Sequence, residues 1–272
     1  MFAALVDLVL PRTCAGCGVP GAMLCRACTL LLAQPRAAAP RRFPDGFPPT
    51  AAAGAYAGPV RAAVLAYKER GRAELAAPLG TALALAVAAV TAAVPGPAVP
   101  GRSVLLVPLP STPAALRARG RDHVRELARS AVAELRTAGL PAREAELLRR
   151  RGRVRDSAGL SAAQRRANLA GTFILSRPGG RPPPGALVVL VDDVVTSGAT
   201  LTEAAGVLAA TRGTADPPVL AAVVAATPRR AAATPVPATG EASPGDLRIV
   251  AAGPFTGTVP PVDRLSGRGR RD

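Results

Sequence analysis

The 272-residue chain contains no tryptophan, and aromatic residues make up only 3% of it. Proteins that bind single-stranded nucleic acid commonly stack bases on aromatic rings, so this scarcity weighs against a dedicated surface of that kind. Lysine and histidine are almost absent as well, because Lys68 is the only lysine among 34 basic residues and His123 is the only histidine. Arginine therefore carries nearly all of the positive charge.

The sequence also lacks an apolar run long enough to cross a membrane. Segment 79–94 is apolar and rich in alanine, but it is shorter than the roughly 20 residues that a spanning helix needs. The amino-terminal stretch has no basic region before its apolar residues and carries Asp7 among them, so we expect no export signal. We predict a cytoplasmic protein without a membrane span, in which 79–94 forms a core helix.

The formal net charge of +16 favours polyanionic partners such as nucleic acid or phosphorylated metabolites. Buried strands are predicted at 103–110, 187–191 and 217–227, with helices at 112–137 and 201–210 between them. Strands that alternate with helices predict an α/β fold with a doubly wound, mainly parallel sheet. Ligands of such sheets bind beyond the carboxyl ends of the strands.

Composition divides the chain into four predicted regions. Residues 1–32 hold a small cysteine module, and the Pro/Arg/Ala-rich stretch 33–50 is typical of a linker. The α/β domain is expected over 51–227, and two short strands within it flank an arginine-rich loop at 149–172. The Pro/Gly/Ala/Thr-rich tail, 228–272, is predicted to be mostly disordered.

All four cysteines lie in the module and follow the spacing C-x2-C-x7-C-x2-C: Cys14, Cys17, Cys25 and Cys28. Two such pairs can place four thiolates around one tetrahedral ion, and Zn²⁺ suits that geometry. An iron–sulfur cluster with the same four ligands is the alternative. Disulfide bonds are not expected without export. We predict a structural zinc ion, since four protein ligands leave no open coordination position.

The stretch LVVLVDDVVTSGATLT, 187–202, combines a buried strand, an acidic pair and a loop of small residues before a helix. Such a loop presents free N–H groups to an anion, and Gly198 permits unusual dihedral angles. Asp192 and Asp193 can accept hydrogen bonds from vicinal ribose hydroxyls, directly or through Mg²⁺. The pattern predicts a ribose 5-phosphate site. The alternative is structural: an acid ends the strand and a threonine caps the helix.

The segment VVLVDDVVTSGAT resembles the phosphoribosyl pyrophosphate (PRPP) signature of type I phosphoribosyltransferases. The cysteine module, YAGPVRAAVLAYKERG, VPLPSTPAALRARG and RRANLAGTF resemble the ComF branch of that group, which is linked to DNA uptake in competence. The resemblance covers about residues 1–227. It implies a type I phosphoribosyltransferase-like fold and a Mg²⁺-dependent glycosyltransferase reaction, in which a phosphoribosyl group passes to an acceptor and pyrophosphate is released.

The same resemblance implies roles for individual residues. Asp192 and Asp193 would be catalytic and bind the ribose hydroxyls, the loop after Pro110 would bind pyrophosphate, and 149–172 would form a lid. The implied 5-phosphate contacts are Thr196, Ser197, Gly198, Ala199 and Thr200. Further candidates for pyrophosphate or lid contacts are Lys68, Arg119, Arg149 and Arg165. The family pattern R-G-F-N-Q is R-G-R-D-H at 119–123 in this chain.

Two alternatives accompany these expectations. Lys68 is either a phosphate contact or a surface lysine, and His123 is predicted at a solvated position because no carboxylate partner is evident. In the second functional hypothesis, the chain is a non-catalytic competence or DNA-processing factor. Its arginine-rich loop would then bind single-stranded DNA, and salt would weaken that binding steeply.

Overall fold

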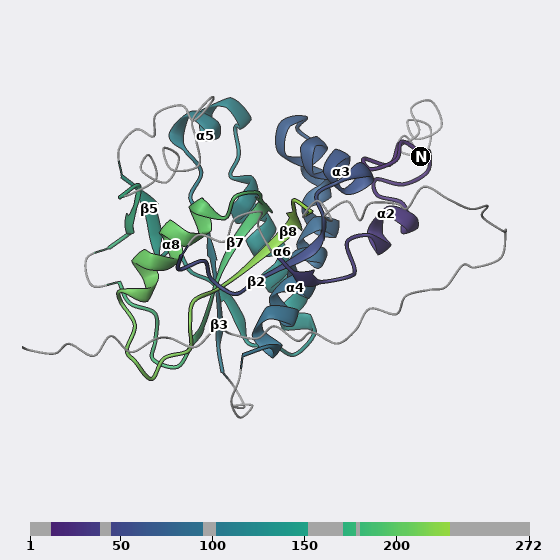
Figure 1. Ribbon diagram of the computed structural model, residues 1–272. Coiled ribbons are helices and arrows are strands. Elements are labelled where there is room, and N and C mark those ends of the chain that lie inside the picture. Colours follow the sequence, from purple (N-terminus) through teal and green to yellow (C-terminus); the bar gives the residue numbers. More distant parts are fainter. Residues whose placement is uncertain (1–11, 39–44, 95–101, 152–170, 178–179, 229–272) are drawn as a thin grey trace, which may run out of the picture. The chain divides into compact units, whose positions relative to one another are not determined.

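The computed structural model describes residues 12–38, 45–94, 102–151, 171–177 and 180–228 (Figure 1). Within these segments, six strands form one sheet in the order β1-β2-β8-β7-β3-β4, and β5 and β6 form a separate pair. Every neighbouring pair in the larger sheet is parallel except β1 with β2. The predicted α/β class and mainly parallel sheet are therefore confirmed.

The strands are β1 (Arg36–Ala37), β2 (Thr50–Ala55), β3 (Val104–Pro108), β4 (Ala142–Glu144), β5 (Leu148–Arg150), β6 (Phe173–Leu175), β7 (Leu187–Val195) and β8 (Leu220–Ala226). The helices are α2 (Arg26–Leu30), α3 (Gly58–Glu69), a short 3-10 turn η1 (Ala73–Leu75), α4 (Ala76–Ala92), α5 (Pro113–Arg119), α6 (His123–Thr137) and α8 (Ala199–Ala209). Arg165 and the tail from residue 229 onward lie outside the described residues.

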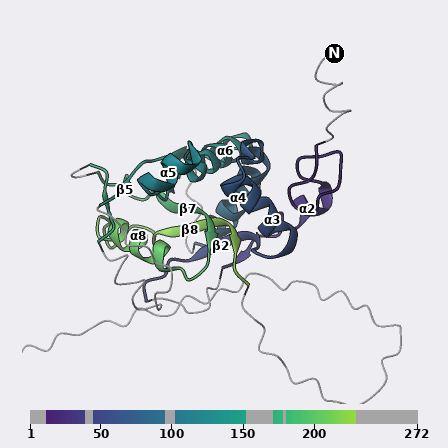
Figure 2. The ribbon, with the colours of Figure 1, turned by 90° about the horizontal axis from the view of Figure 1, so that it is seen from above.

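The central strands are apolar throughout because both faces of the sheet are covered. Successive residues of β7 enter opposite cores: Val189 belongs to one buried cluster and Val188 to the other. Helices α3, α4 and α6 contribute to the first cluster, whereas α8 and the β5-β6 pair contribute to the second. Figure 2 shows α4 and α6 on one side of the strands and α8 on the other.

The order of the strands reverses between β3 and β7. From β7 the chain passes through α8 to β8 on one side, and from β3 it passes through α5 and α6 to β4 on the other. In open parallel sheets, connections that diverge in this way leave a crevice beyond the carboxyl ends of the two central strands. The sheet therefore offers a binding position at the ends of β3 and β7.

Strand β7 continues past the position where the sequence predicted its end. We expected the aspartates to lie where the strand leaves the sheet at Val191, but pairing with β8 runs on to Val195. Pairing with β3, in contrast, stops at Val191. The acidic pair therefore lies in the last part of β7, which pairs with β8 along one edge and has no paired strand on the other edge within the described sheet.

The single helix predicted over 112–137 is wrong. Gly120 adopts a positive φ of 65° and ends α5, and Asp122 then caps α6 by accepting a hydrogen bond from the N–H of Arg125 at 3.3 Å. A left-handed residue cannot continue a right-handed helix, so the chain turns here. The break places His123 at the start of α6.

Helix α4 is the predicted core helix. The apolar stretch is longer than the sequence indicated: together with η1, α4 makes a 20-residue apolar helical stretch that is long enough to cross a membrane, but half of its most apolar window is buried inside the structure. Leu79, Leu83 and Val87 are fully buried in the first cluster. This packing is typical of the core helix of a globular domain.

The cysteine module packs against the α/β domain. Leu32 is 2% exposed and belongs to the cluster shared with α3 and α4, and Arg72 donates a hydrogen bond from Nη1 to the carbonyl of Thr13 at 2.9 Å. Within the segment predicted as a linker, β1 pairs with β2 at the edge of the sheet. The module and the domain therefore share a core.

Gly80 sets the distance between α4 and α6, and its replacement gives a test of this packing. A Cβ atom at Gly80 would lie 2.3 Å from Cβ of Ser130, so we expect Gly80→Ala to destabilise the protein by about 1–3 kcal/mol. The gain in helix propensity, about 1 kcal/mol, does not offset such a clash. Urea unfolding monitored by circular dichroism measures the change.

Gly206→Ala is the matched control, because Gly206 lies in α8 and an added Cβ there meets nothing within 4 Å. This variant should keep or raise stability, since only helix propensity changes. Equal stability of the two variants would show that α4 and α6 can move apart without cost.

Candidate functional site

A cavity of about 380 Å³ lies at the carboxyl ends of β3 and β7. Its wall combines residues from the β2–α3 connection, α3, the β3–α5 connection, α5, α6, β5, the end of β7, and the loop and first turn of α8 that follow it. The polar side chains in the wall include Lys68, Arg119, His123, Arg150, Asp192, Asp193, Thr196 and Thr200. The reversal of strand order thus brings together residues from segments far apart in the sequence.

Asp193 is the anchor of this wall. Its side chain is almost completely buried, and its Oδ2 atom lies 2.7 Å from Lys68 Nζ and 3.3 Å from His123 Nε2. Its Oδ1 atom accepts the N–H of Val194 at 2.8 Å. Burial by itself would raise the pKa of this carboxyl, but His123 and Lys68 lower it well below its usual range.

Asp192 lies beside it in a different electrostatic setting. Its Oδ1 atom accepts the N–H of Asp193 at 2.8 Å, and the side chain is half-buried in the cavity wall. Burial and the neighbouring charge of Asp193 raise the pKa of Asp192 well above its ordinary value, although Lys68 opposes the rise. The pKa values of the two carboxyl groups are therefore shifted in opposite directions, and their partners differ.

The loop after β7 has the form that the sequence predicted. Gly198 has a φ of 77°, the left-handed conformation expected of it, and α8 begins at the next residue. Thr196 and Thr200 line the cavity, whereas Gly198 and Ala199 are buried beneath it and Ser197 is half-buried. The first turn of α8 leaves backbone N–H groups without helical partners, which is the basis of anion binding at helix starts.

Two arginines complete the wall. Arg119 forms an ion pair with Glu69 at 2.9 Å. Arg150 donates from Nε to the carbonyl of Pro110 at 2.8 Å, and its guanidinium lies 4.8 Å from the centre of the Phe173 ring. Both arginines are thus held in place beside the loop that follows β3.

Half-buried Lys68 and buried His123 both contact Asp193, which the sequence did not reveal. The prediction of a solvated His123 is wrong: the residue is 3% exposed, and Asp193 is the carboxylate partner that the sequence did not show. A signal was present, because His123 shares the four-residue spacing of Leu127 and Ala131 on the buried face of α6. The identity of its partner was not predictable, since 70 positions separate the two residues.

The arginines of β5 differ in exposure. Arg150, which was not among the predicted contacts, lines the cavity, whereas the predicted Arg149 is exposed. Neighbouring residues of a strand point to opposite sides, so only one of the two can face the site.

The residues that depart from the R-G-F-N-Q pattern have local roles. Arg121 stacks over the Tyr67 ring at 4.2 Å and lies 3.1 Å from Glu126, while Asp122 caps α6. These contacts fix the start of α6 against α3. The substituted positions therefore support the helix that carries His123.

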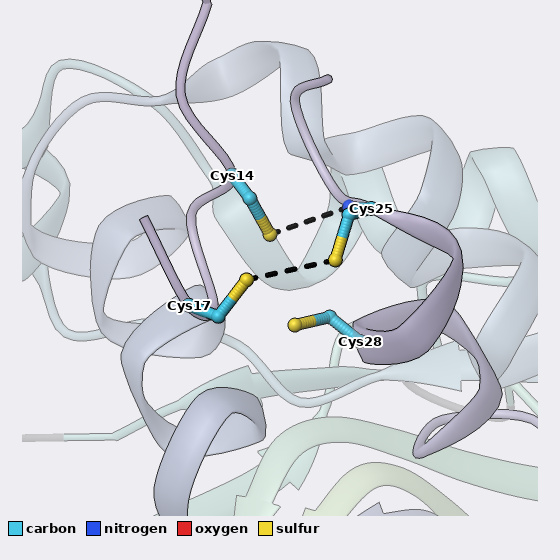
Figure 3. Close-up of side chains that lie close together, drawn as sticks. All are labelled: Cys14, Cys17, Cys25 and Cys28. Carbon is cyan, nitrogen blue, oxygen red and sulfur yellow. Dashed lines mark hydrogen bonds between the residues drawn. The ribbon is translucent and has the colours of Figure 1, made fainter. Parts of the chain in front are cut away.

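The second candidate site is the cysteine cluster. The four Sγ atoms of Cys14, Cys17, Cys25 and Cys28 all lie within 4.8 Å of one another, and Figure 3 shows them pointing toward a common centre. A tetrahedral zinc ion with bonds of about 2.3 Å places neighbouring sulfurs about 3.8 Å apart. Cys17 and Cys25 meet this requirement with a separation of 3.6 Å. The cluster can therefore hold one metal ion such as zinc.

The backbone prepares Cys14 for a cation, whereas burial raises the pKa of the Cys28 thiol well above its usual range. Burial raises the pKa of the Cys14 thiol, but hydrogen bonds from the N–H groups of Cys17, Cys25 and Gly16 outweigh burial and lower it to about 6. The Cys25 N–H lies 3.3 Å from Cys14 Sγ. A thiolate is the form that binds metal, so Cys14 is set up as a ligand.

Comparison with known families and curated proteins gave no matching family model and no matching protein. Functional assignment therefore depends on the residues of the two candidate sites.

We predict one zinc ion per chain, and Cys25→Ser should release it. Because the module shares a core with α3 and α4, the melting temperature of the whole described fold should fall with metal loss. Elemental analysis and calorimetry measure the two effects, and Arg26→Ser, an exposed neighbour, is the control. Freshly purified protein that contains iron, or no metal, would contradict the assignment of zinc.

Proposed function

We propose that the chain is a PRPP-binding, phosphoribosyltransferase-like protein of the ComF type. The observation that carries the proposal is the composition of one cavity wall, in which Asp192, the hydroxyl residues Thr196 and Thr200, and Arg150 line the same space. A ribose phosphate that carries a diphosphate needs these three kinds of contact. The reversal of strand order at this position also agrees with a doubly wound sheet of the type I phosphoribosyltransferase class.

The ribose hydroxyls would bind to Asp192. Asp193 already receives hydrogen bonds or ion pairs from three groups, so Asp192 is the carboxylate with capacity for vicinal hydroxyls. A carboxylate oxygen is also a ligand that Mg²⁺ accepts, and Mg²⁺ bound here with the diphosphate would neutralise part of its charge.

The 5-phosphate and the diphosphate of PRPP would bind at opposite sides of Asp192. The 5-phosphate fits the loop before α8, where Thr196 and Thr200 supply hydroxyls and the helix start supplies N–H groups. The diphosphate would fit the side formed by Ser111 and Thr112, which follow β3, and by Arg150 of β5; Ser111 and Thr112 lie where the pyrophosphate loop is expected.

In this arrangement the reaction would break the bond between the anomeric carbon and pyrophosphate and form a bond from that carbon to an acceptor nucleophile. The electron pair of the broken bond leaves with pyrophosphate, and guanidinium groups stabilise its negative charge. Fixing the ribose at its hydroxyls and 5-phosphate orients the anomeric carbon for attack.

Asp192→Asn and Thr200→Val test the proposal on the two halves of the site. Each removes one hydrogen-bonding function without changing size, and hydrogen bonds to charged groups contribute about 1.5–3 kcal/mol, so we expect affinity for Mg²⁺–PRPP to fall by about tenfold or more. Titration calorimetry with PRPP and with ribose 5-phosphate measures it.

Glu134→Gln is the control, since Glu134 is exposed on α6 and also loses a carboxylate. Asp193 is a poor choice for this test, because its removal would leave Lys68 and His123 without their shared partner. Equal affinity in the wild type and both site variants, with folding intact, would show that the cavity is not a PRPP site.

Affinity should also depend on pH through Asp192. Its raised pKa means that a proton is retained at pH values where an ordinary aspartate is ionised, and the ionised form accepts hydroxyl hydrogen bonds more strongly than the protonated form. Binding should therefore strengthen as pH rises through that pKa. Calorimetry over a series of pH values should show this component in the wild type and not in Asp192→Asn.

A further inference from the structure

His123 and Lys68 approach the same carboxylate oxygen from two different helices. Lys68, at the end of α3, lies 2.7 Å from Asp193 Oδ2, and His123, at the start of α6, lies 3.3 Å from it. Tyr67 joins the two helices by donating its hydroxyl to the backbone carbonyl of His123 at 2.7 Å. The Asp193 carboxylate is therefore fixed from the side of the sheet that α3 and α6 cover.

Asp192 does not share the contacts that Asp193 makes with Lys68 and His123. Side chains of consecutive strand residues point to opposite faces, and within the described part of the chain no hydrogen bond or ion pair joins Asp192 to α3 or α6. Its contact is the N–H of Asp193, so the position of one carboxylate depends on the backbone that carries the other. Any movement of Asp193 would therefore also move Asp192.

We propose that His123 is a positioning residue of the cavity: with Lys68 it holds Asp193, and thereby places Asp192 as the carboxylate that meets the ligand. The ligand-binding role of Asp192 rests on the proposed function, in which the ligand is a ribose phosphate. The contact between His123 and Asp193 does not depend on it.

The geometry fixes which ring nitrogen carries the proton. Asp193 is acceptor-only when ionised, so Nε2 must be the donor across the 3.3 Å contact. The other ring nitrogen, Nδ1, is buried with no hydrogen-bond partner among the described residues. A bare Nδ1 avoids burying an unpaired N–H group, so the neutral ring should be the Nε2–H tautomer.

The chain has one histidine, which makes this tautomer directly measurable. Ring-nitrogen resonances of protein with isotope-labelled histidine report His123 alone. We expect the Nε2–H pattern in the wild type, a clear change in Asp193→Asn, and a smaller change in Asp192→Asn. An Nδ1–H pattern, or equal responses to the two variants, would overturn the inference.

Binding of ribose 5-phosphate supplies the functional readout. His123→Leu removes the donor and should reduce affinity by up to about tenfold, because the displaced Asp192 can cost the ligand at most the equivalent of one hydrogen bond to a charged group. His123→Gln keeps a neutral N–H donor of similar reach and should retain most of the affinity. Similar losses in both variants, or in neither, would contradict a positioning role.

A third variant keeps the test decisive if His123→Leu fails to fold. Lys68→Met removes the other contact to Asp193 and should shift the His123 resonances as well as weaken binding, whereas Arg61→Met, on the same helix, should do neither. If wild-type protein binds no ribose phosphate, the proposed function fails. The resonances then still decide whether His123 holds Asp193.

Discussion

The unequal lengths of the two central strands control the rest of the structure. β3 stops pairing at Pro108, opposite Val191, while β7 continues along β8 to Val195. Hydrogen bonds to β8 keep the last residues of β7 extended, and the missing neighbour on the other edge leaves space beside them. The cavity occupies this space, and the loop after β3 forms its opposite wall. A longer β3 would fill the position where the acidic pair now faces the cavity.

Within this space, the alternation of the strand separates two chemically identical residues. Asp193 points to the layer of α3 and α6, where Lys68 and His123 stabilise its charge despite burial. Asp192 lacks those helix partners, and the charge of Asp193 makes its own ionisation harder. A buried carboxylate with two donors is stable as an anion, and its neighbour becomes the group that can respond to a ligand or a proton.

Helix α3 connects the cavity to the cysteine cluster. Its last turn carries Lys68. Its first turn lies beside the module, where a Cβ atom on Gly16 would come within 3.1 Å of the carbonyl oxygen of Pro59. Beyond its end, Arg72 donates a hydrogen bond to the carbonyl of Thr13. The module is therefore part of the support of the wall. A metal ion in the cluster would hold the loops that contact both ends of α3.

Local patterns in the sequence predicted the features that depend on neighbouring residues: the buried strands, the left-handed Gly198, and four cysteines spaced for one ion. Short-range hydrophobic runs, glycine conformation and ligand spacing are local, so pattern alone predicts them. Three features became visible only in the folded structure: His123 is buried against Asp193, Arg150 rather than Arg149 lines the cavity, and β7 extends past Val191. The partners in these contacts depend on which distant segments become neighbours, and local sequence patterns do not specify that.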